Sequence, residues 1–220
     1  MEFILVFLAI ILFTFLGWLL KQSFNTQPWI AEAVSDAESQ APFGAGAKLV
    51  ALTALLAVVT SFFALIMSAY AERMELGDWV PLDEPRMLFL NTAMLVAASI
   101  AFQWTRNAAN RGQVSRLKPG MYVSGLLTLA FVVGQLLVWK QLNAAGEGLT
   151  ANPANGFFFL VTGAHALHIL GGLYVWARAT VRLHTGNNAV PIRQSIELCT
   201  VYWHYLLLVW LLLLGLLLST

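Results

Sequence analysis

The chain has 220 residues, of which 59% are hydrophobic and 10% charged, whereas charged residues make up about a quarter of an ordinary soluble domain. This composition excludes a soluble globular protein and is typical of a chain that crosses a membrane several times. A net charge of +1 gives no support for nucleic-acid binding, and a single cysteine, Cys199, excludes an intrachain disulfide framework and a cysteine-based zinc site.

Six uncharged apolar runs follow one another along the chain. As α-helices, runs of about 20 residues cross the roughly 30 Å hydrocarbon core of a bilayer. We therefore predict an all-α, polytopic membrane helix bundle with six transmembrane helices. The runs are Phe3–Leu20, Leu49–Tyr70, Met87–Trp104, Tyr122–Trp139, Phe157–Trp176 and Leu198–Leu218.

The first run stands apart from the other five. Glu2 occupies a position where a signal peptide would carry lysine, and no small-residue cleavage site follows closely, so we interpret this run as a retained helix. A long segment rich in Asn, Gln, Ser, Pro and Gly follows it, as expected of a loop. The sequence thus predicts an N-terminal helix and polar loop over residues 1–47 and a five-helix membrane domain over residues 48–220.

Lysine and arginine are distributed unevenly between the two sets of loops. Nine lie in the loops after the first, third and fifth runs, and three lie in the opposite loops. The positive-inside rule places the richer set in the cytoplasm. We therefore expect an inner-membrane protein of a bacterium whose C-terminus, and by parity whose N-terminus, faces the periplasm.

Three histidines lie within the last two runs, at positions 165, 168 and 204. An imidazole in a transmembrane helix costs free energy unless it finds polar partners. His168 and His204 lie at a similar depth on consecutive antiparallel helices, so we expect them to lie near each other and to bind protein groups or water. Asn91, Gln135 and Thr162 form a possible second polar layer in the outer half. We interpret both sets as packing contacts between helices.

Other roles for the histidines stay open. His165 and His168 are three residues apart and can share a helix face, and His204 could add a third imidazole. Such a set could bind copper or haem. Proton transfer and a lipid-facing position are further alternatives.

At these residues the sequence resembles subunit III of the haem-copper oxidases. The run FFFLVTGAHALHILGG is similar to the family's Phe-rich segment with Thr-Gly, two histidines spaced by three, and glycine. Three further segments follow the family's order, and the resemblance covers about Lys48 to the C-terminus. They are LNTAMLVAAS, LLTLAFVVGQ and IELCTVYWHYLLLVWL. The family-motif residues outside the histidines are Gly163, Gly171, Glu197, Tyr202, Trp203 and Trp210.

Two positions depart from the family pattern. The resemblance places a buried glutamate in the helix that contains Val59, and an aspartate three residues after His204, where this chain has Leu207. Any proton-buffering role that depends on these acids is therefore in doubt.

The resemblance implies a non-catalytic subunit of a respiratory terminal oxidase that couples O2 reduction to proton translocation. It would hold no catalytic residue, metal or cofactor, because haem and copper belong to subunits I and II. It would pack against subunit I, stabilise it and bind phospholipid. Two alternatives remain, the related membrane subunit of a nitric oxide reductase and an independent bis-histidine cytochrome b.

Overall fold

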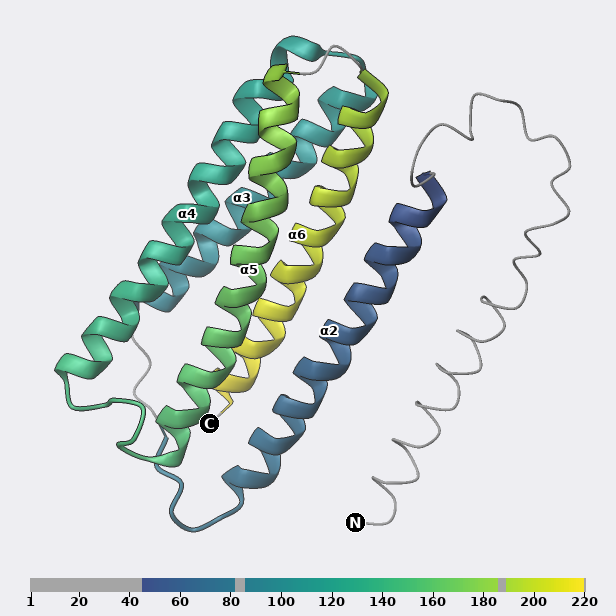
Figure 1. Ribbon diagram of the computed structural model, residues 1–220. Helices are drawn as coiled ribbons and strands as arrows, with labels where there is room; N and C mark the ends of the chain where they lie inside the picture. The colour runs from purple at the N-terminus through teal and green to yellow at the C-terminus, as the bar shows by residue number, and fades with distance from the viewer. Residues whose placement is uncertain (1–44, 82–85, 186–188, 220) are drawn as a thin grey trace, which may run out of the picture. The chain divides into compact units, whose positions relative to one another are not determined.

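The computed structural model describes residues 45–81, 86–185 and 189–219, and five long helices run through these ranges (Figure 1). Each is long and apolar enough to cross a membrane. The described part of the chain is therefore an all-helical membrane fold, and the predicted helix Phe3–Leu20 lies outside it. The helices are α2 (Ala45–Met74), α3 (Met87–Asn110), α4 (Val114–Ala144), α5 (Pro153–Thr185) and α6 (Ala189–Leu218).

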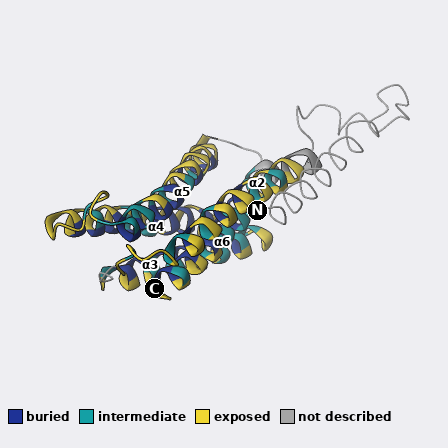
Figure 2. Cartoon of the chain, turned by 90° about the horizontal axis from the view of Figure 1, so that it is seen from below, coloured by how far each residue is buried: buried dark blue, intermediate teal, exposed yellow. Residues whose placement is uncertain are grey.

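Four of these helices form a closed bundle. Helix α3 packs against α4 and α6, and α5 packs against the same two neighbours. Helix α2 lies outside this square, against α5 and α6. Residues coloured as buried lie mainly on the faces that the helices turn toward one another, and residues coloured as exposed lie on the outer faces (Figure 2).

The helices extend beyond the apolar runs that predicted them. Helix α4 begins at Val114 rather than Tyr122, and α5 continues to Thr185 rather than ending at Trp176. Hydropathy marks the part of a helix that lies in hydrocarbon, whereas backbone hydrogen bonding continues into the polar boundary of the membrane. The helix ends are therefore set by turn residues. Gly112, with φ of 67°, reverses the chain between α3 and α4.

Small residues allow large aromatic side chains to fill the spaces between helices. A Cβ atom at Gly125 of α4 would overlap the indole of Trp176 on α5. At Gly172 of α5 it would lie 2.8 Å from the ring of Tyr202 and 3.0 Å from that of Trp203. Close approach at small residues is a common way to pack helices in a membrane, where lipid is as apolar as the side chains.

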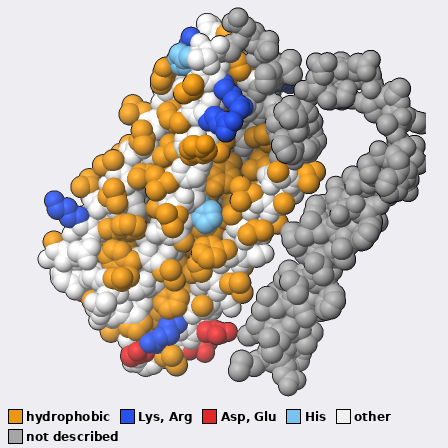
Figure 3. All heavy atoms as spheres, in the orientation of Figure 1, with side chains coloured by type: hydrophobic (Ala, Val, Ile, Leu, Met, Phe, Trp, Pro, Cys, Tyr) orange, Lys and Arg blue, Asp and Glu red, His pale blue; other side chains and the backbone are white. Residues whose placement is uncertain are grey.

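The outer surface matches a membrane environment. Hydrophobic side chains cover the middle of the face shown in Figure 3, and the visible acidic side chains gather at one end. At that end, Arg73 in the last turn of α2 forms a bidentate ion pair with Asp78, with nitrogen–oxygen distances of 2.6 and 2.5 Å. The guanidinium lowers the pKa of the Asp78 carboxyl from its ordinary value of 3.8.

Candidate functional site

A row of polar side chains joins α3 to α6 around His204. Its Nδ1 is hydrogen-bonded to the hydroxyl of Ser99, and its Nε2 lies 3.0 Å from Oε1 of Gln103. A carboxamide oxygen only accepts, so Nε2 carries a proton, and in the neutral imidazole Nδ1 then accepts from Ser99. Gln103 then donates from its own Nε2 to Oδ1 of Asn107 over 3.1 Å. In that form the donors run in one direction from Ser99 to Asn107. We call these four side chains the polar row.

His165 is fully buried and ties α5 to α6. Its Nε2 donates to the backbone carbonyl of Leu206 over 3.0 Å. The ring lies among aromatic side chains, with centroids 5.0 Å from Trp210 and 5.9 Å from Phe131. Its Nδ1 has no hydrogen-bond partner among the described residues. A carbonyl only accepts, so this histidine also carries its proton on Nε2 and acts as a donor between helices.

His168 occupies a different side of the structure. Its Nδ1 donates to the carbonyl of Ala164 in its own helix over 2.7 Å, and its ring centroid lies 5.3 Å from that of Phe63 on α2. The expected contact between His168 and His204 is therefore wrong. Tyr202 of α6 donates to the backbone oxygen of His168 over 3.0 Å. Two residues farther along a helix the side chain has turned by about 200°. His204 thus faces α3 while Tyr202 faces α5.

The three imidazoles do not converge on a common point. His165 binds a carbonyl of α6, His168 binds its own helix, and His204 binds side chains of α3. Within the described ranges, no group of three or more His, Cys, Asp and Glu side chains could hold a metal ion. A copper or haem site needs ligand nitrogens aimed at one position. The arrangement of these residues does not fit such a group.

The predicted outer polar layer consists of two separate contacts. Nδ2 of Asn91 on α3 donates to Oε1 of Gln135 on α4 over a long 3.4 Å, and both side chains are buried. Thr162 of α5 instead contacts α4, because its hydroxyl accepts from the indole N–H of Trp139 over 3.0 Å. The same hydroxyl donates to the carbonyl of Phe158, one turn earlier.

This tryptophan–threonine contact recurs across the bundle. Trp203 of α6 donates to Thr128 of α4 over 3.0 Å, and Trp210 of α6 donates to Thr92 of α3 over 2.9 Å. Each threonine hydroxyl also donates to a carbonyl one turn earlier in its own helix. An indole N–H is a donor only, so a hydroxyl whose proton is already used presents the matching acceptor. Three pairs of helices are linked in this way without any charge.

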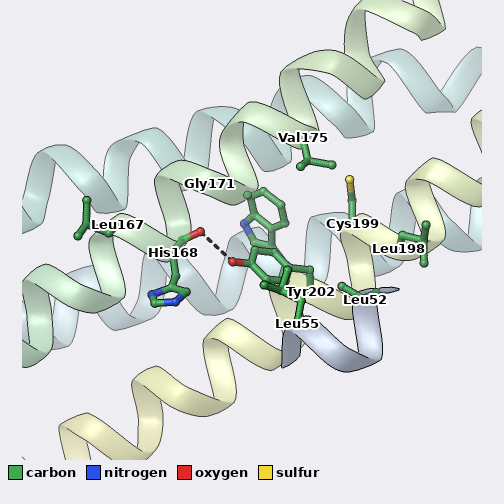
Figure 4. A pocket seen from close by; sticks show the side chains of 11 residues that line it. Leu52, Leu55, Leu167, His168, Gly171, Val175, Leu198, Cys199 and Tyr202 are labelled. Atoms are coloured by element: carbon green, nitrogen blue, oxygen red, sulfur yellow. Dashed lines mark hydrogen bonds between the residues drawn. The ribbon is translucent and has the colours of Figure 1, made fainter. Parts of the chain in front are cut away.

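An apolar cleft of about 450 Å³ lies between α2, α5 and α6 (Figure 4). Leu52 of α2, Val175 of α5 and Leu198 of α6 contribute to its walls. It extends beside Gly171, where an added Cβ would meet no atom within 4 Å. The Tyr202 hydroxyl, drawn with its hydrogen bond to His168, lies at the same cleft.

Comparison with known proteins identifies the family. A family model described as cytochrome c oxidase subunit III matches residues 2–218. The chain belongs to the cytochrome c oxidase subunit III family. A probable cytochrome c oxidase subunit 3 of Nocardia farcinica is 30% identical over 156 residues, covering 68% of this chain and 76% of that protein. The Mycobacterium bovis protein of the same description is also 30% identical, over 74% of this chain and 80% of its own. The cytochrome c oxidase subunit 3 of Corynebacterium diphtheriae is 26% identical over the same shares.

Membership makes this chain a subunit III of a haem-copper oxidase, a multi-subunit respiratory complex of the membrane. The subunit III motif residues serve several structural roles. Glu197 pairs with Arg106 of α3 at 2.7 Å. Tyr202, Trp203 and Trp210 donate the hydrogen bonds already described, and Gly171 lies at the apolar cleft. A Cβ at Gly163 would make an ordinary contact with Trp139 at 3.6 Å.

The two positions where the resemblance places acids differ in their surroundings. Val59 is buried and belongs to the apolar core, near Phe63 on the next turn of α2. Leu207 is half-buried and lies beside His204 in a groove between α3 and α6. A carboxylate would therefore lie in the core at the first position and at the polar row at the second.

Several residues of this subunit III were not singled out from the sequence. Ser99 and Trp139 are the clearest cases, since each completes a contact of a predicted residue. A signal existed for Ser99, because Ser99, Gln103 and Asn107 recur at intervals of four and share one helix face. No spacing in the sequence shows which threonine a tryptophan reaches on another helix.

Proposed function

We propose that this subunit III is non-catalytic, packs against the catalytic subunit I and stabilises it. Subunits I and II would hold the haem and copper that reduce O2 with proton translocation. The observation that carries the proposal is the internal use of the intramembrane histidines. His165, His168 and His204 each spend a ring nitrogen on a hydrogen bond within their own chain. The hydrogen bonds of His165 and His204 join two helices, that of His168 stays within α5, and the three imidazoles form no converged ligand set.

The test is purification of the oxidase through a tag on this chain. We expect subunits I and II to co-purify with stoichiometric haem and copper, and this chain to carry neither metal after detergent separates it. His204→Leu should lower the amount of subunit III retained, because it leaves Ser99 and Gln103 without their partner, yet the haem spectrum should be unchanged. Haem on the isolated chain would indicate a cytochrome b instead, and non-haem iron in place of copper would indicate a nitric oxide reductase.

We also propose that the apolar cleft holds an acyl chain of a phospholipid. Its walls are apolar and lie in the membrane-spanning part. Arg178 and Arg182 follow Gly171 and Val175 on the same face of α5, at helical spacings of three, four and seven. Both arginines are exposed and could bind a lipid phosphate.

Filling the cleft tests this proposal. Gly171→Phe should place a ring in the space beside residue 171 and reduce the number of phospholipids that remain bound to the purified complex. Gly215→Phe is the matched control, because an added Cβ at Gly215 also meets no atom within 4 Å. Equal lipid content in the two variants would contradict acyl-chain binding in this cleft.

We place the chain in the inner membrane of a bacterium with its C-terminus, and by parity its N-terminus, in the periplasm. The excess of Lys and Arg in one set of loops supports this orientation. A cysteine at Gly148, between α4 and α5, should react with an impermeant reagent added from outside, and one at Gln113, between α3 and α4, should not. The native Cys199 is buried and gives a low background. Labelling only at position 113 would reverse the topology.

We propose that residues 1–47 form a separate N-terminal helix and loop that contacts a neighbouring subunit, while residues 48–220 form the five-helix domain. The long polar segment between the first two apolar runs supports this organisation. Deletion of residues 1–40 tests it. The idea fails if the shortened chain still assembles with every partner at full yield.

A further inference from the structure

Two buried polar atoms inside the four-helix bundle lack hydrogen-bond partners. They are Nε2 of Gln135 on α4 and Nδ1 of His165 on α5, and neither has a partner in the described part of the chain. The two residues are 1% and 0% exposed. Roughly 90% or more of buried polar groups in proteins are hydrogen-bonded, because leaving one unpaired costs its full desolvation free energy. Two unpaired atoms in one bundle therefore need an explanation.

Neighbouring contacts place these two residues at one level of the bundle. Phe131, one turn before Gln135 on α4, has its ring centroid 5.9 Å from that of His165. Trp139, one turn after Gln135, donates to Thr162, which lies one turn before His165 on α5. Residues three or four apart share a helix face. Gln135 therefore lies between two residues of α4 that already contact this part of α5.

The two unpaired atoms have complementary chemistry. Asn91 of α3 donates to Oε1 of Gln135, so the N–H edge of this carboxamide is turned away from Asn91. Nε2 of His165 donates to the carbonyl of Leu206, so Nδ1 of the neutral imidazole is an acceptor. One of the two unpaired atoms is thus a donor and the other an acceptor.

Few ligands can join a buried donor to a buried acceptor. A metal cation cannot accept a hydrogen bond from an amide N–H, and a fully deprotonated anion cannot donate one to an imidazole nitrogen. Water does both and is the smallest ligand of this kind. Buried water typically makes about three hydrogen bonds to groups that are otherwise unsatisfied. Its second proton can go to a backbone carbonyl, because each carbonyl oxygen has two lone pairs.

We infer that one water molecule is bound inside the bundle, where it accepts a hydrogen bond from Nε2 of Gln135 and donates one to Nδ1 of His165. This water links the four helices of the closed bundle at one level. Asn91 of α3 and Gln135 of α4 lie on one side of it, and His165 of α5 with the carbonyl of Leu206 on α6 lies on the other. The site lies within this chain, so it goes beyond the proposed function and does not depend on contacts with other subunits.

Solid-state NMR of the full chain in lipid bilayers, with 15N in histidine and tryptophan, tests for the water. Magnetisation from water protons should reach Nδ1 of His165 at short mixing times. His184 is exposed and is the positive reference. The indole nitrogen of Trp210 is the negative reference, because it is buried and donates directly to Thr92. Transfer to His165 no stronger than transfer to Trp210 would overturn the inference.

A double-mutant cycle tests the link between the two side chains. Gln135→Met should lower the folding equilibrium constant about fivefold more in the unchanged chain than in His165→Phe, the effect of one hydrogen bond of ordinary strength. The cycle cancels the separate contacts with Asn91 and Leu206. Gln103→Met is the matched control, because Gln103 contacts the polar row instead, and its effect should be the same in both backgrounds.

Two results of the cycle would contradict the water site. Additive effects of Gln135→Met and His165→Phe would show that the two side chains are not linked. Coupling without transfer of magnetisation from water would show a direct contact in place of the water. The NMR measurement uses the unchanged chain, so it decides the question even if a variant fails to fold.

Discussion

The contact between α3 and α6 differs in kind from the contact between α2 and the bundle. Polar links join α3 to α6 along their length, from Thr92–Trp210 through Ser99–His204 to Arg106–Glu197. Helix α2 packs mainly through apolar and aromatic side chains such as Phe63. Its Thr60 accepts a hydrogen bond from Tyr205 of α6 over 2.9 Å, because the threonine proton goes to Leu56 in its own helix.

This difference shows how specificity is built where apolar burial no longer drives association. Helices in lipid gain little from covering apolar surface, so their register depends on close packing and on hydrogen bonds between them. Several such bonds fix α3 against α6 at more than one level. Helix α2 is held less specifically, and it forms one wall of the apolar cleft. We therefore expect substitutions at the contact between α3 and α6 to cost more than similar ones on α2.

The largest effect is expected from a matched pair of Phe→Ala changes. Phe102 of α3 is fully buried, with its ring 4.3 Å from that of Trp203, whereas Phe62 of α2 is 43% exposed. Phe102→Ala should reduce the free energy of unfolding by about 3 kcal/mol, because it leaves a cavity at the centre of the bundle. Phe62→Ala should change it by well under about 1 kcal/mol. Unfolding of the purified subunit by a denaturing detergent measures the free energy of unfolding of both variants. Equal decreases in the two variants would show that the two contacts do not differ in strength.

A smaller effect is expected from one buried link of the bundle. Thr128→Val keeps the shape of the side chain but leaves the indole N–H of Trp203 unpaired in a fully buried position. We expect a loss of about 1–2 kcal/mol in the free energy of unfolding. Restoring an acceptor with Thr128→Ser should recover most of it. No recovery with serine would mean that packing, rather than the hydrogen bond, is responsible.

The hydrogen bond of α2 should be worth less than that of Thr128. Tyr205→Phe removes the donor to Thr60, which is exposed and keeps its bond to Leu56. We expect a change of about 0.6 kcal/mol, the average for such bonds measured in a membrane protein. A double-mutant cycle that combines Tyr205→Phe with Thr60→Ala measures the coupling free energy between these two side chains. A coupling larger than the loss in Thr128→Val would reverse the ranking of the two regions.

The ion pair between Arg73, in the last turn of α2, and Asp78 should have the smallest effect. Arg73 lowers the pKa of Asp78, so the contribution of this carboxylate to stability is present above its ordinary value of 3.8 and is lost as the pH falls through the lowered value. The pair is exposed to solvent, where such bonds contribute little. Asp78→Asn should therefore leave the thermal midpoint at pH 7 nearly unchanged and should alter its pH dependence only below about pH 4. A large shift at pH 7 would show that the pair fixes α2 in place.

The sequence alone indicated the family and predicted the five helices of the described part that are long and apolar enough to cross a membrane. These conclusions rest on apolar runs such as Met87–Trp104 and on local motifs such as the residues around His165, and both are properties of neighbouring positions. The ends of the helices were harder to predict from the sequence, because helix α4 already includes Val114 to Met121, whereas its apolar run begins only at Tyr122.

The tertiary structure decided which polar residues meet. Depth in the membrane can be counted along a helix, and His168 and His204 do lie near the middle of their helices, but the direction of a side chain turns by about 100° per residue. A partner can be named only when the rotation of both helices is known. That rotation is fixed by packing across the whole bundle, as where Trp203 fills the space beside Gly172 and thereby turns His204 toward Ser99.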